Sequence, residues 1–313
     1  MKISVVIITK NRSNLLKLCL RSLTSQIRLP DEIVLVDNNS EEDIMTVVKS
    51  FNKRININYV LEKNEGTAFA RNKGVRSSRY NLIAFIDSDC IADKNWLKNI
   101  EFCFRKYPEI KVMMGKTLCA NPVNLITKTG QFLRKYYVTS QHLNPKNIFF
   151  QVKRYLFPNS FNKSYFILNF LTENLAIKKS VFKKVGLFDE SIIATEEDSE
   201  LSWRLKKNNI KVLFQPKIVV RHHHRESLKD FFIQYFLYGM GISNIKRKWT
   251  DFPTRIPNNL FNLLLFLFGF FVMPFFKIVQ LKRLKDLVFL SPLILFNEFA
   301  FRFGIIYGMF KTK

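Results

Sequence analysis

The stretch NLIAFIDSDCIAD, residues 81–93, carries an apolar run straight into two aspartates. The run at 82–86 has the length and composition of a strand that is buried on both faces of a sheet. Asp87 and Asp89 follow it with one serine between them. Two carboxylates at this spacing can both approach one divalent ion, although aspartates are also common at strand ends without a metal. Asp93 is better placed than either to cap the helix that begins in DKNWLKNIEF.

The first 120 residues alternate between runs of strand length and segments of helical period. Apolar runs occupy residues 3–9, 32–37, 57–61, 82–86 and 112–118. Between them lie amphipathic segments such as NLLKLCLRSLTSQ and SEEDIMTVVKSF, the second of which opens with a serine cap and acidic residues. This alternation predicts an α/β fold, a mostly parallel, doubly wound sheet flanked by helices. Ligands bind such sheets at the carboxyl ends of the strands, so Asp37, which ends the second run, is expected near Asp87 and Asp89.

The composition points to an anionic partner. Lysine and arginine total 50 against 25 acidic residues, which gives a formal net charge of +25. Nucleic acid, nucleotide phosphates and an anionic membrane surface all fit this excess, and its even spread along the chain favours a membrane surface at least as much as a nucleic-acid groove. The four cysteines form no C-x-x-C pair, which predicts reduced thiols and a cytosolic catalytic domain. The apolar run in MKISVVIITKN is short for a signal peptide.

The last sixty residues are apolar in two runs, at 260–276 and 287–296. A spanning helix needs about 20 apolar residues, so the first run is borderline, and the second leads into a segment that contains Glu298 and Arg302. If both crossed a membrane, the basic linker KIVQLKRLKD would lie on the outer face, against the positive-inside rule. We therefore expect a hydrophobic helical hairpin at the membrane interface with its lysines at headgroup level. A helical subdomain packed on the main domain is the alternative.

Several motifs occur in a fixed order: SVVIITKNR, EIVLVDNNS, KNEGTAFARNKGV, AFIDSD and TEEDSELSWRL. Together with NLAIKKSVFKKVGLFDES and RHHHRESLKDFFIQYFLYGMG, they resemble glycosyltransferase family 2, inverting sugar-nucleotide enzymes with a GT-A fold. The resemblance covers roughly residues 3–240, except for residues 121–170. We interpret this segment as a variable insertion that could contact the acceptor. The resemblance implies a GT-A catalytic domain at 1–245 and a hydrophobic helical membrane-associating segment at 246–313.

The resemblance implies a donor site for a UDP- or GDP-linked sugar. The residues that it places there are Thr9, Asn11, Arg12, Asp37, Asn64, Gly66, Arg71, Asp87 and Asp89. Asp37 would accept a base N–H, which a buried strand-end carboxylate does well. Asp87 would contact the ribose or the metal, and Asp89 would hold Mn²⁺ or Mg²⁺ against the diphosphate, where the ion acts as a Lewis acid.

The run HHH at 222–224 suggests a metal ligand. Successive strand residues point to opposite faces, so His222 and His224 share a side, but two histidines alone make a weak zinc site. The resemblance places His222 in the metal site of Asp87 and Asp89, with His224 as the second choice. A basic, solvated strand end is the alternative.

The segment TEEDSE supplies the general base that the resemblance implies, Asp198. An inverting transfer needs one carboxylate to take the proton of the acceptor hydroxyl. An acidic helix start that favours the helix dipole is the other explanation of this segment. Glu197, Trp203 and Arg204 would contact the acceptor. Processive members of the family carry a Q-x-x-R-W motif, whereas this chain has Trp203 followed by Arg204 and no such glutamine. The difference indicates a non-processive enzyme. Trp203 would also suit the buried face of a helix.

These features predict a glycosyltransferase that moves one sugar to a lipid-linked or membrane-proximal acceptor at the cytoplasmic face of the cell membrane. A nucleotidyltransferase would carry a G-x-G-x-R loop where this chain has TKNRSNLL. A non-enzymatic basic protein that binds membrane or nucleic acid on a degenerate GT-A fold explains the charge but leaves the ordered aspartates unexplained. We expect no nucleic-acid partner.

Overall fold

The computed structural model of the protein describes residues 1–52, 55–139, 162–192, 195–253 and 260–311. These residues form two compact units. The first holds the described residues of Met1–Ala120, Phe161–Glu190 and Glu197–His223, and the second those of Asn121–Ser160, Ser191–Glu196 and His224–Lys313. Of the predicted insertion at 121–170, residues 140–161 lie outside the described part of the chain.

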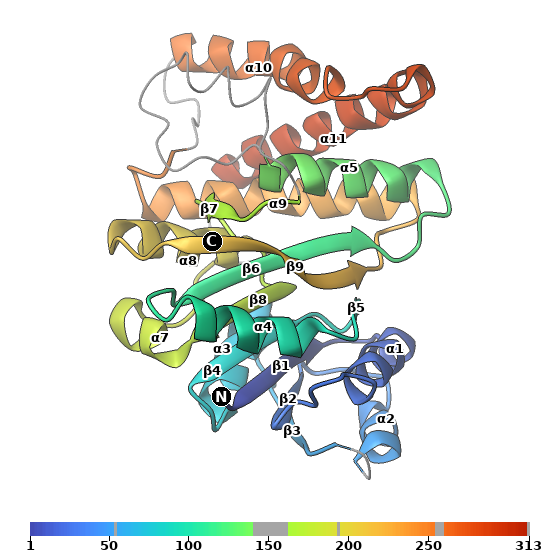
Figure 1. The fold of residues 1–313 in the computed structure, drawn as a ribbon. Helices are drawn as coiled ribbons and strands as arrows, with labels where there is room; N and C mark the ends of the chain where they lie inside the picture. The colour runs from blue at the N-terminus through green and yellow to red at the C-terminus, as the bar shows by residue number, and fades with distance from the viewer. Residues whose placement is uncertain (53–54, 140–161, 193–194, 254–259, 312–313) are drawn as a thin grey trace. The chain divides into compact units, whose positions relative to one another are not determined.

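A mixed sheet forms the centre of the first unit (Figure 1). Its strands follow the order β3-β2-β1-β4-β8-β6-β9-β5, and β7 also pairs with β9. The strands are β1 (Ile3–Thr9), β2 (Glu32–Asp37), β3 (Ile57–Leu61), β4 (Leu82–Ile86), β5 (Cys90–Ala92), β6 (Val112–Cys119), β7 (Tyr165–Ile167), β8 (Asn174–Lys178) and β9 (Val212–His222). Strands β1 to β4 pair in parallel, as do β6 and β9, whereas β8 runs antiparallel to β4 and β6. The predicted mostly parallel α/β sheet is confirmed.

Helices cover this sheet with the apolar faces that the sequence predicts. They are α1 (Ser13–Thr24), α2 (Ile44–Phe51), α3 (Thr67–Ser77), α4 (Trp96–Lys106), α7 (Lys179–Val185) and α8 (Glu197–Lys207). Helix α1 buries Leu16, Leu20 and Leu23 in the same cluster as Ile3 and Ile33 of the sheet. Burying apolar surface in this way stabilises the layer that carries the strand ends.

Strand β9 crosses a proline without ending. Pro216 lies inside this strand, whose register with β6 shifts between Gly115 and Lys116. The shift fits Pro216 into a bulge, where its missing N–H breaks no ladder hydrogen bond. The strand then continues to His222, which pairs with Cys90 of β5. The bulge therefore sets the register of the residues that end β9.

Asn174 holds this bulge together. Its side-chain amide donates to the carbonyls of Lys116 and Ile218, both at 3.1 Å, and its carbonyl oxygen accepts from the Trp96 indole at 2.9 Å. Asn174→Ala is expected to lower the free energy of unfolding by about 3 kcal/mol, because three buried groups lose their partner. Urea denaturation tests this.

Asn99→Ala is the matched control for that measurement. Its amide makes one solvent-exposed hydrogen bond, to the Lys217 carbonyl at 2.6 Å. The expected loss is below about 1 kcal/mol. Equal losses in the two variants would contradict the role given to Asn174.

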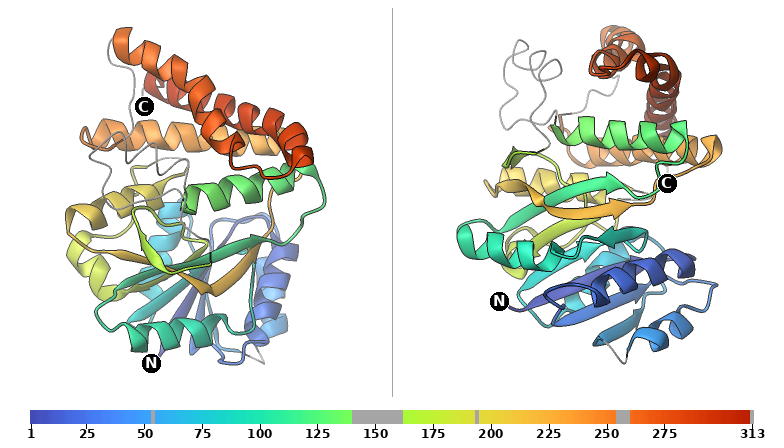
Figure 2. Two further views of the ribbon diagram at one scale, coloured as in Figure 1. Left: turned by 45° about the horizontal axis from the view of Figure 1, so that its top comes forward. Right: turned by 45° about the vertical axis from the view of Figure 1, so that its right-hand side comes forward.

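The second unit is helical (Figure 2). Its helices are α5 (Leu125–Thr139), α9 (Leu228–Lys248), α10 (Leu260–Ile278) and α11 (Leu284–Phe310). Helix α11 packs along α9 and also touches α5 and α10. The apolar helices α10 and α11 form the predicted pair, and α9 runs through the predicted domain boundary at 245/246.

The second apolar run, at 287–296, forms part of a helix that also includes the segment after it. The structure has one helix of 27 residues that continues through Pro292, Glu298 and Arg302. Both charges are buried and paired: Glu298 accepts from Arg302 Nε at 2.6 Å and from Lys277 Nζ at 2.9 Å. In the described part of the chain, α11 is the one helix that is long and apolar enough to cross a membrane.

Candidate active site

Strands β1 and β2 end in a group of buried polar side chains. Their parallel register places Thr9 opposite Asp37. Asp37 accepts a hydrogen bond from the backbone N–H of Ser40 at 3.0 Å and one from the hydroxyl of Tyr59 at 2.9 Å. Partial burial, with a smaller effect of Asp37, raises the pKa of Tyr59 to about 12, so its hydroxyl stays a donor. The Thr9 hydroxyl is buried and has no partner among the described residues, so it is ready for a ligand.

Two asparagines tie the neighbouring loops together. Asn11, in the left-handed region with φ 51°, accepts from the backbone N–H of Glu41 at 2.7 Å. Asn38 donates to the carbonyl of Asn64 at 2.7 Å and accepts from the N–H of Gly66 at 3.0 Å. Gly66 has φ 137°, which a residue with a side chain rarely adopts. The sequence analysis did not include Asn38 among the site residues. Its position directly after Asp37, at the end of a strand, could have indicated that it belongs to the site.

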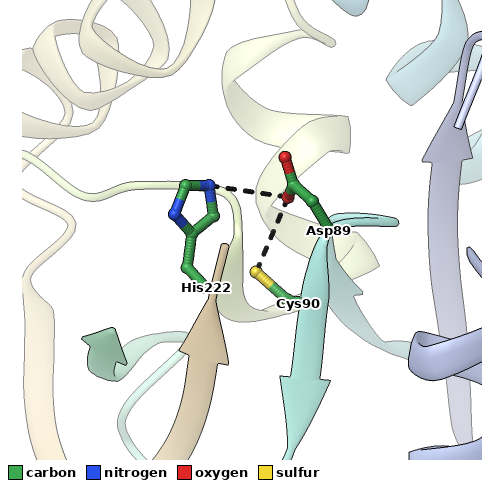
Figure 3. Close-up of side chains that lie close together, drawn as sticks. All are labelled: Asp89, Cys90 and His222. Carbon is green, nitrogen blue, oxygen red and sulfur yellow. Dashed lines mark hydrogen bonds and ion pairs between the residues drawn. The ribbon is translucent and has the colours of Figure 1, made fainter. Parts of the chain in front are cut away.

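A second cluster lies where β5 and β9 pair (Figure 3). His222 Nε2 lies 3.5 Å from Asp89 Oδ1, and the Cys90 thiol donates to the same oxygen at 3.9 Å. The other Asp89 oxygen forms an ion pair with Arg12. In the described part of the chain, Asp89, Cys90 and His222 are the group whose ligand atoms lie within 4.8 Å of one another. The sequence analysis singled out Arg12, Asp89 and His222 as site residues and missed Cys90.

The chemistry of these groups favours a hard divalent ion held by two of them. Burial, followed by the charge of Asp89, raises the pKa of the Cys90 thiol well above its usual range. A thiol is also a softer ligand than Mn²⁺ or Mg²⁺ prefers. The Asp89 carboxylate is a ligand that Mn²⁺ and Mg²⁺ prefer, and the His222 imidazole is a nitrogen ligand that favours Mn²⁺ over Mg²⁺. Their 3.5 Å separation fits metal–ligand bonds of about 2.0–2.2 Å. Asp87 lies outside this cluster of described residues.

Arg71 organises a third group. It is buried and pairs with Asp87, with 3.5 Å between Nη2 and Oδ1, and with Glu197. Its guanidinium also lies over the ring of Phe188, 5.9 Å from the centroid. The positive charge of Arg71 acts on Asp198, the second residue of α8. Arg71 therefore links two predicted donor residues to the predicted base.

The surroundings of Asp198 raise the pKa of its carboxyl group. Burial raises its pKa above the usual range, while Arg71 and the backbone N–H of Ser199, at 2.8 Å from Oδ1, oppose the shift. A carboxylate with a raised pKa accepts a proton more strongly than an exposed one.

The remaining predicted residues lie further along α8 and in the chain after β9. Arg204 binds Glu200 through Nε at 2.9 Å and donates to the carbonyls of Val185 and Leu187, contacts that hold the end of α7. The Trp203 ring lies 4.8 Å from Lys206 Nζ. The acceptor roles of Glu197, Trp203 and Arg204 stay predictions.

His224 belongs to the second unit, where its backbone N–H donates to Asn121 at 2.9 Å.

Comparison with known sequences identifies the chain. The sequence model of glycosyl transferase family 2 matches residues 4–185. The chain belongs to this family. This family 2 glycosyltransferase is 28% identical over 221 residues to the chondroitin synthase of Pasteurella multocida strain Pm70, a match that covers 65% of the chain and 23% of the synthase. It is 26% identical over 245 residues to the O-antigen chain rhamnosyltransferase RfbN of Salmonella typhimurium, covering 77% of the chain and 72% of RfbN. The chain thus spans less than a quarter of the first relative.

Solved structures share the GT-A fold of the glycosyltransferase. The mannosyltransferase PcManGT from Pyrobaculum calidifontis, in complex with GDP-Man and Mn²⁺, superposes with a TM-score of 0.63 at 13% identity, over 99% of this chain and 87% of that one. S. aureus TarS 1-349 in complex with UDP-GlcNAc gives a TM-score of 0.52 at 16% identity, over 99% and 90%.

Proposed function

We propose that this glycosyltransferase transfers one sugar from a UDP- or GDP-linked donor to a lipid-linked or membrane-proximal hydroxyl, with inversion at the anomeric carbon. The observation that carries the proposal is the half-buried Asp198 in the field of Arg71, which also pairs with Asp87 at the end of β4. The complexes of PcManGT with GDP-Man and of TarS with UDP-GlcNAc support a nucleotide-sugar donor. The family assignment speaks against a non-enzymatic binder.

The donor is held by groups at the strand ends. Asp37 accepts a base N–H, and the unpartnered hydroxyl of Thr9 supplies a further contact beside it. Arg12 faces the diphosphate from its ion pair with Asp89. A Mn²⁺ or Mg²⁺ ion held by Asp89 and His222 would act as a Lewis acid and stabilise the charge on the departing nucleoside diphosphate.

Asp198 performs the proton transfer. Its carboxylate takes the proton of the acceptor hydroxyl while that oxygen attacks the anomeric carbon. The bond to the diphosphate breaks on the opposite face, which inverts the configuration. The positive charge of Arg71 favours the ionised form of Asp198 and opposes the effect of burial on its pKa. Its pairs with Asp87 and Glu197 fix the guanidinium in that position.

The second unit supports the proposed acceptor. Helix α11 is long and apolar enough to enter a membrane. We assign catalysis to residues 1–245 and membrane association, at the cytoplasmic face, to residues 246–313. The free thiols of Cys19, Cys90 and Cys103 are in keeping with a reducing compartment.

Thermal unfolding of the detergent-solubilised protein with UDP- and GDP-sugars, with and without Mn²⁺, tests the donor. A ligand at 100 times its Kd stabilises the native state by about 2.7 kcal/mol, so the midpoint should rise with one nucleotide class and only when metal is present. No rise with any nucleotide would refute the donor site.

The activity should depend on pH through Asp198. The ionised form is the base, and burial raises its pKa above the value of 3.8 of an exposed aspartate. The acidic limb of kcat/KM is therefore expected above that pH. Because the folded-state pKa is raised, the stability linked to this group is full at low pH and is lost as pH rises through the raised pKa. The profiles are measured at saturating Mn²⁺, and an acidic limb at or below pH 3.8 contradicts the assignment.

A further inference from the structure

Helix α11 presents one continuous apolar face to the outside. Its exposed side chains recur every three or four residues, the spacing that keeps them on one side of a helix. We call this set the apolar stripe; it consists of Leu284, Val288, Pro292, Leu295, Phe299, Phe303, Tyr307 and Phe310. Phe299 is 51% exposed, and Phe310 is 79% exposed. A water-soluble surface helix would place polar residues here.

Beyond its first turn, the charged and amide side chains of α11 lie on its buried face instead. Asn297, Glu298 and Arg302 are each less than a tenth exposed. Arg302 donates to the carbonyl of Phe266 in α10 at 2.6 Å, and Glu298 binds both Arg302 and Lys277. Charges inside and phenylalanines outside are the reverse of the arrangement in water. Helices in contact with lipid show this order, because an unpaired charge is expensive there.

The packing of α11 against α9 is also of a kind favoured in lipid. A Cβ on Gly304 would lie 2.0 Å from the Phe236 carbonyl oxygen, and one on Gly239 would lie 1.9 Å from that of Phe301. The Ser243 hydroxyl donates across the interface to the carbonyl of Ile305 at 2.8 Å. Small residues that let two backbones touch, with serine hydrogen bonds between them, drive helix association where lipid removes the hydrophobic contribution.

The charges around α11 decide its orientation. At its start lie the exposed Arg283 and Lys285, and at its end Arg247 donates to the carbonyls of Gly308 and Lys311. The helix is about 40 Å long, with basic groups at both ends. Anionic headgroups of one leaflet can meet both ends only if the helix lies flat.

The helices packed on α11 lead to the same orientation. Helices α5 and α9 contact it and carry the exposed Lys128, Lys135 and Lys229. If α11 crossed the bilayer, these lysines would be drawn toward hydrocarbon, at a cost of about 2.5–3.5 kcal/mol each at its centre.

We infer that α11 lies parallel to the membrane surface, with its apolar stripe at the boundary of the acyl chains and its basic ends on anionic headgroups. This rests on the membrane association of the proposed function and does not involve the donor site. The partner is an anionic lipid bilayer, and a second copy of the chain covering the stripe is the competing occupant.

Depth measurements distinguish the arrangements. Nitroxide labels are attached to cysteines that replace Val288, Leu295, Phe303 or Phe310, in a Cys119→Ser background, on the full chain in phosphatidylcholine vesicles with phosphatidylglycerol. A flat helix places all four labels at one depth, about 5–10 Å below the headgroups. A label at Leu295 near the bilayer centre, about 15 Å deep, with shallow labels at both ends, would overturn the inference in favour of a spanning helix.

Flotation of the same vesicles measures affinity. The double substitution Phe299→Ser and Phe303→Ser is expected to weaken vesicle binding by at least about tenfold, because two large apolar groups are lost. Phe102→Ser, which replaces a phenylalanine of the first unit that is 57% exposed, should leave binding unchanged. Unchanged binding by the double variant, or dimers that mask the labels, would overturn the inference. The metal-dependent thermal shift with donor shows whether the donor site works, so the two proposals can fail separately.

Discussion

Asp198→Asn is expected to lower kcat by about 10²–10⁴-fold while donor binding is retained, because an amide cannot take the proton of the acceptor. The asparagine oxygen can still accept from the N–H of Ser199, so the start of α8 should keep its local structure. Turnover of a donor with a short lipid-like acceptor measures kcat, and the thermal shift with nucleotide measures binding. Unchanged kcat would show that another group is the base.

The stability of the same variant separates the two explanations of the acidic segment. If Asp198 served only to complement the helix dipole, neutralising it would lower the unfolding midpoint. Burial raises its pKa, so the charge costs stability at neutral pH, and Asp198→Asn should keep or raise the midpoint. Glu200→Gln is the matched control, because Glu200 lies in the same turn and pairs with Arg204 at 2.7 Å. It should lower stability and leave kcat largely intact.

The strand ends could be predicted because their signal is local. An apolar run that stops at an aspartate predicts both the strand and the edge where its carboxylate lies, and Asp37 and Asp87 follow this pattern. Parallel pairing of consecutive strands then brings the ends of β1 and β2 together, as the register of Thr9 and Asp37 shows.

The contacts between distant segments could not be predicted in the same way. Cys90 faces His222 only because β5 pairs antiparallel with β9, across a register shift around Pro216. Arg71 meets Glu197 through the fold of the first unit, and no spacing in the sequence encodes that pair. In the sequence, Glu298 and Arg302 look like charged interruptions of an apolar helix. The structure shows that they pair with each other, and a paired charge can be buried at far lower cost than a lone one.

Asp89→Asn is expected to remove the metal-dependent part of donor binding and to lower activity by about 10²–10⁴-fold, the effect of losing several kcal/mol of charge stabilisation. Because Asp89 also pairs with Arg12, that variant alone does not isolate the metal. His222→Ala removes the other ligand, whose ring lies 3.5 Å from Asp89, and should abolish the Mn²⁺ dependence of the thermal shift as well.

Cys90→Ser completes this comparison, because it changes the third member of the cluster and keeps its size. Burial and the charge of Asp89 raise the pKa of the Cys90 thiol, and a thiol is a softer ligand than Mn²⁺ or Mg²⁺ prefers. The serine variant should therefore bind Mn²⁺ and donor as the parent does. If it loses metal dependence together with His222→Ala, the thiol is a ligand, and the cluster prefers a softer ion than Mn²⁺ or Mg²⁺. If only the aspartate and histidine variants lose it, the ion would be held by Asp89 and His222 without the thiol.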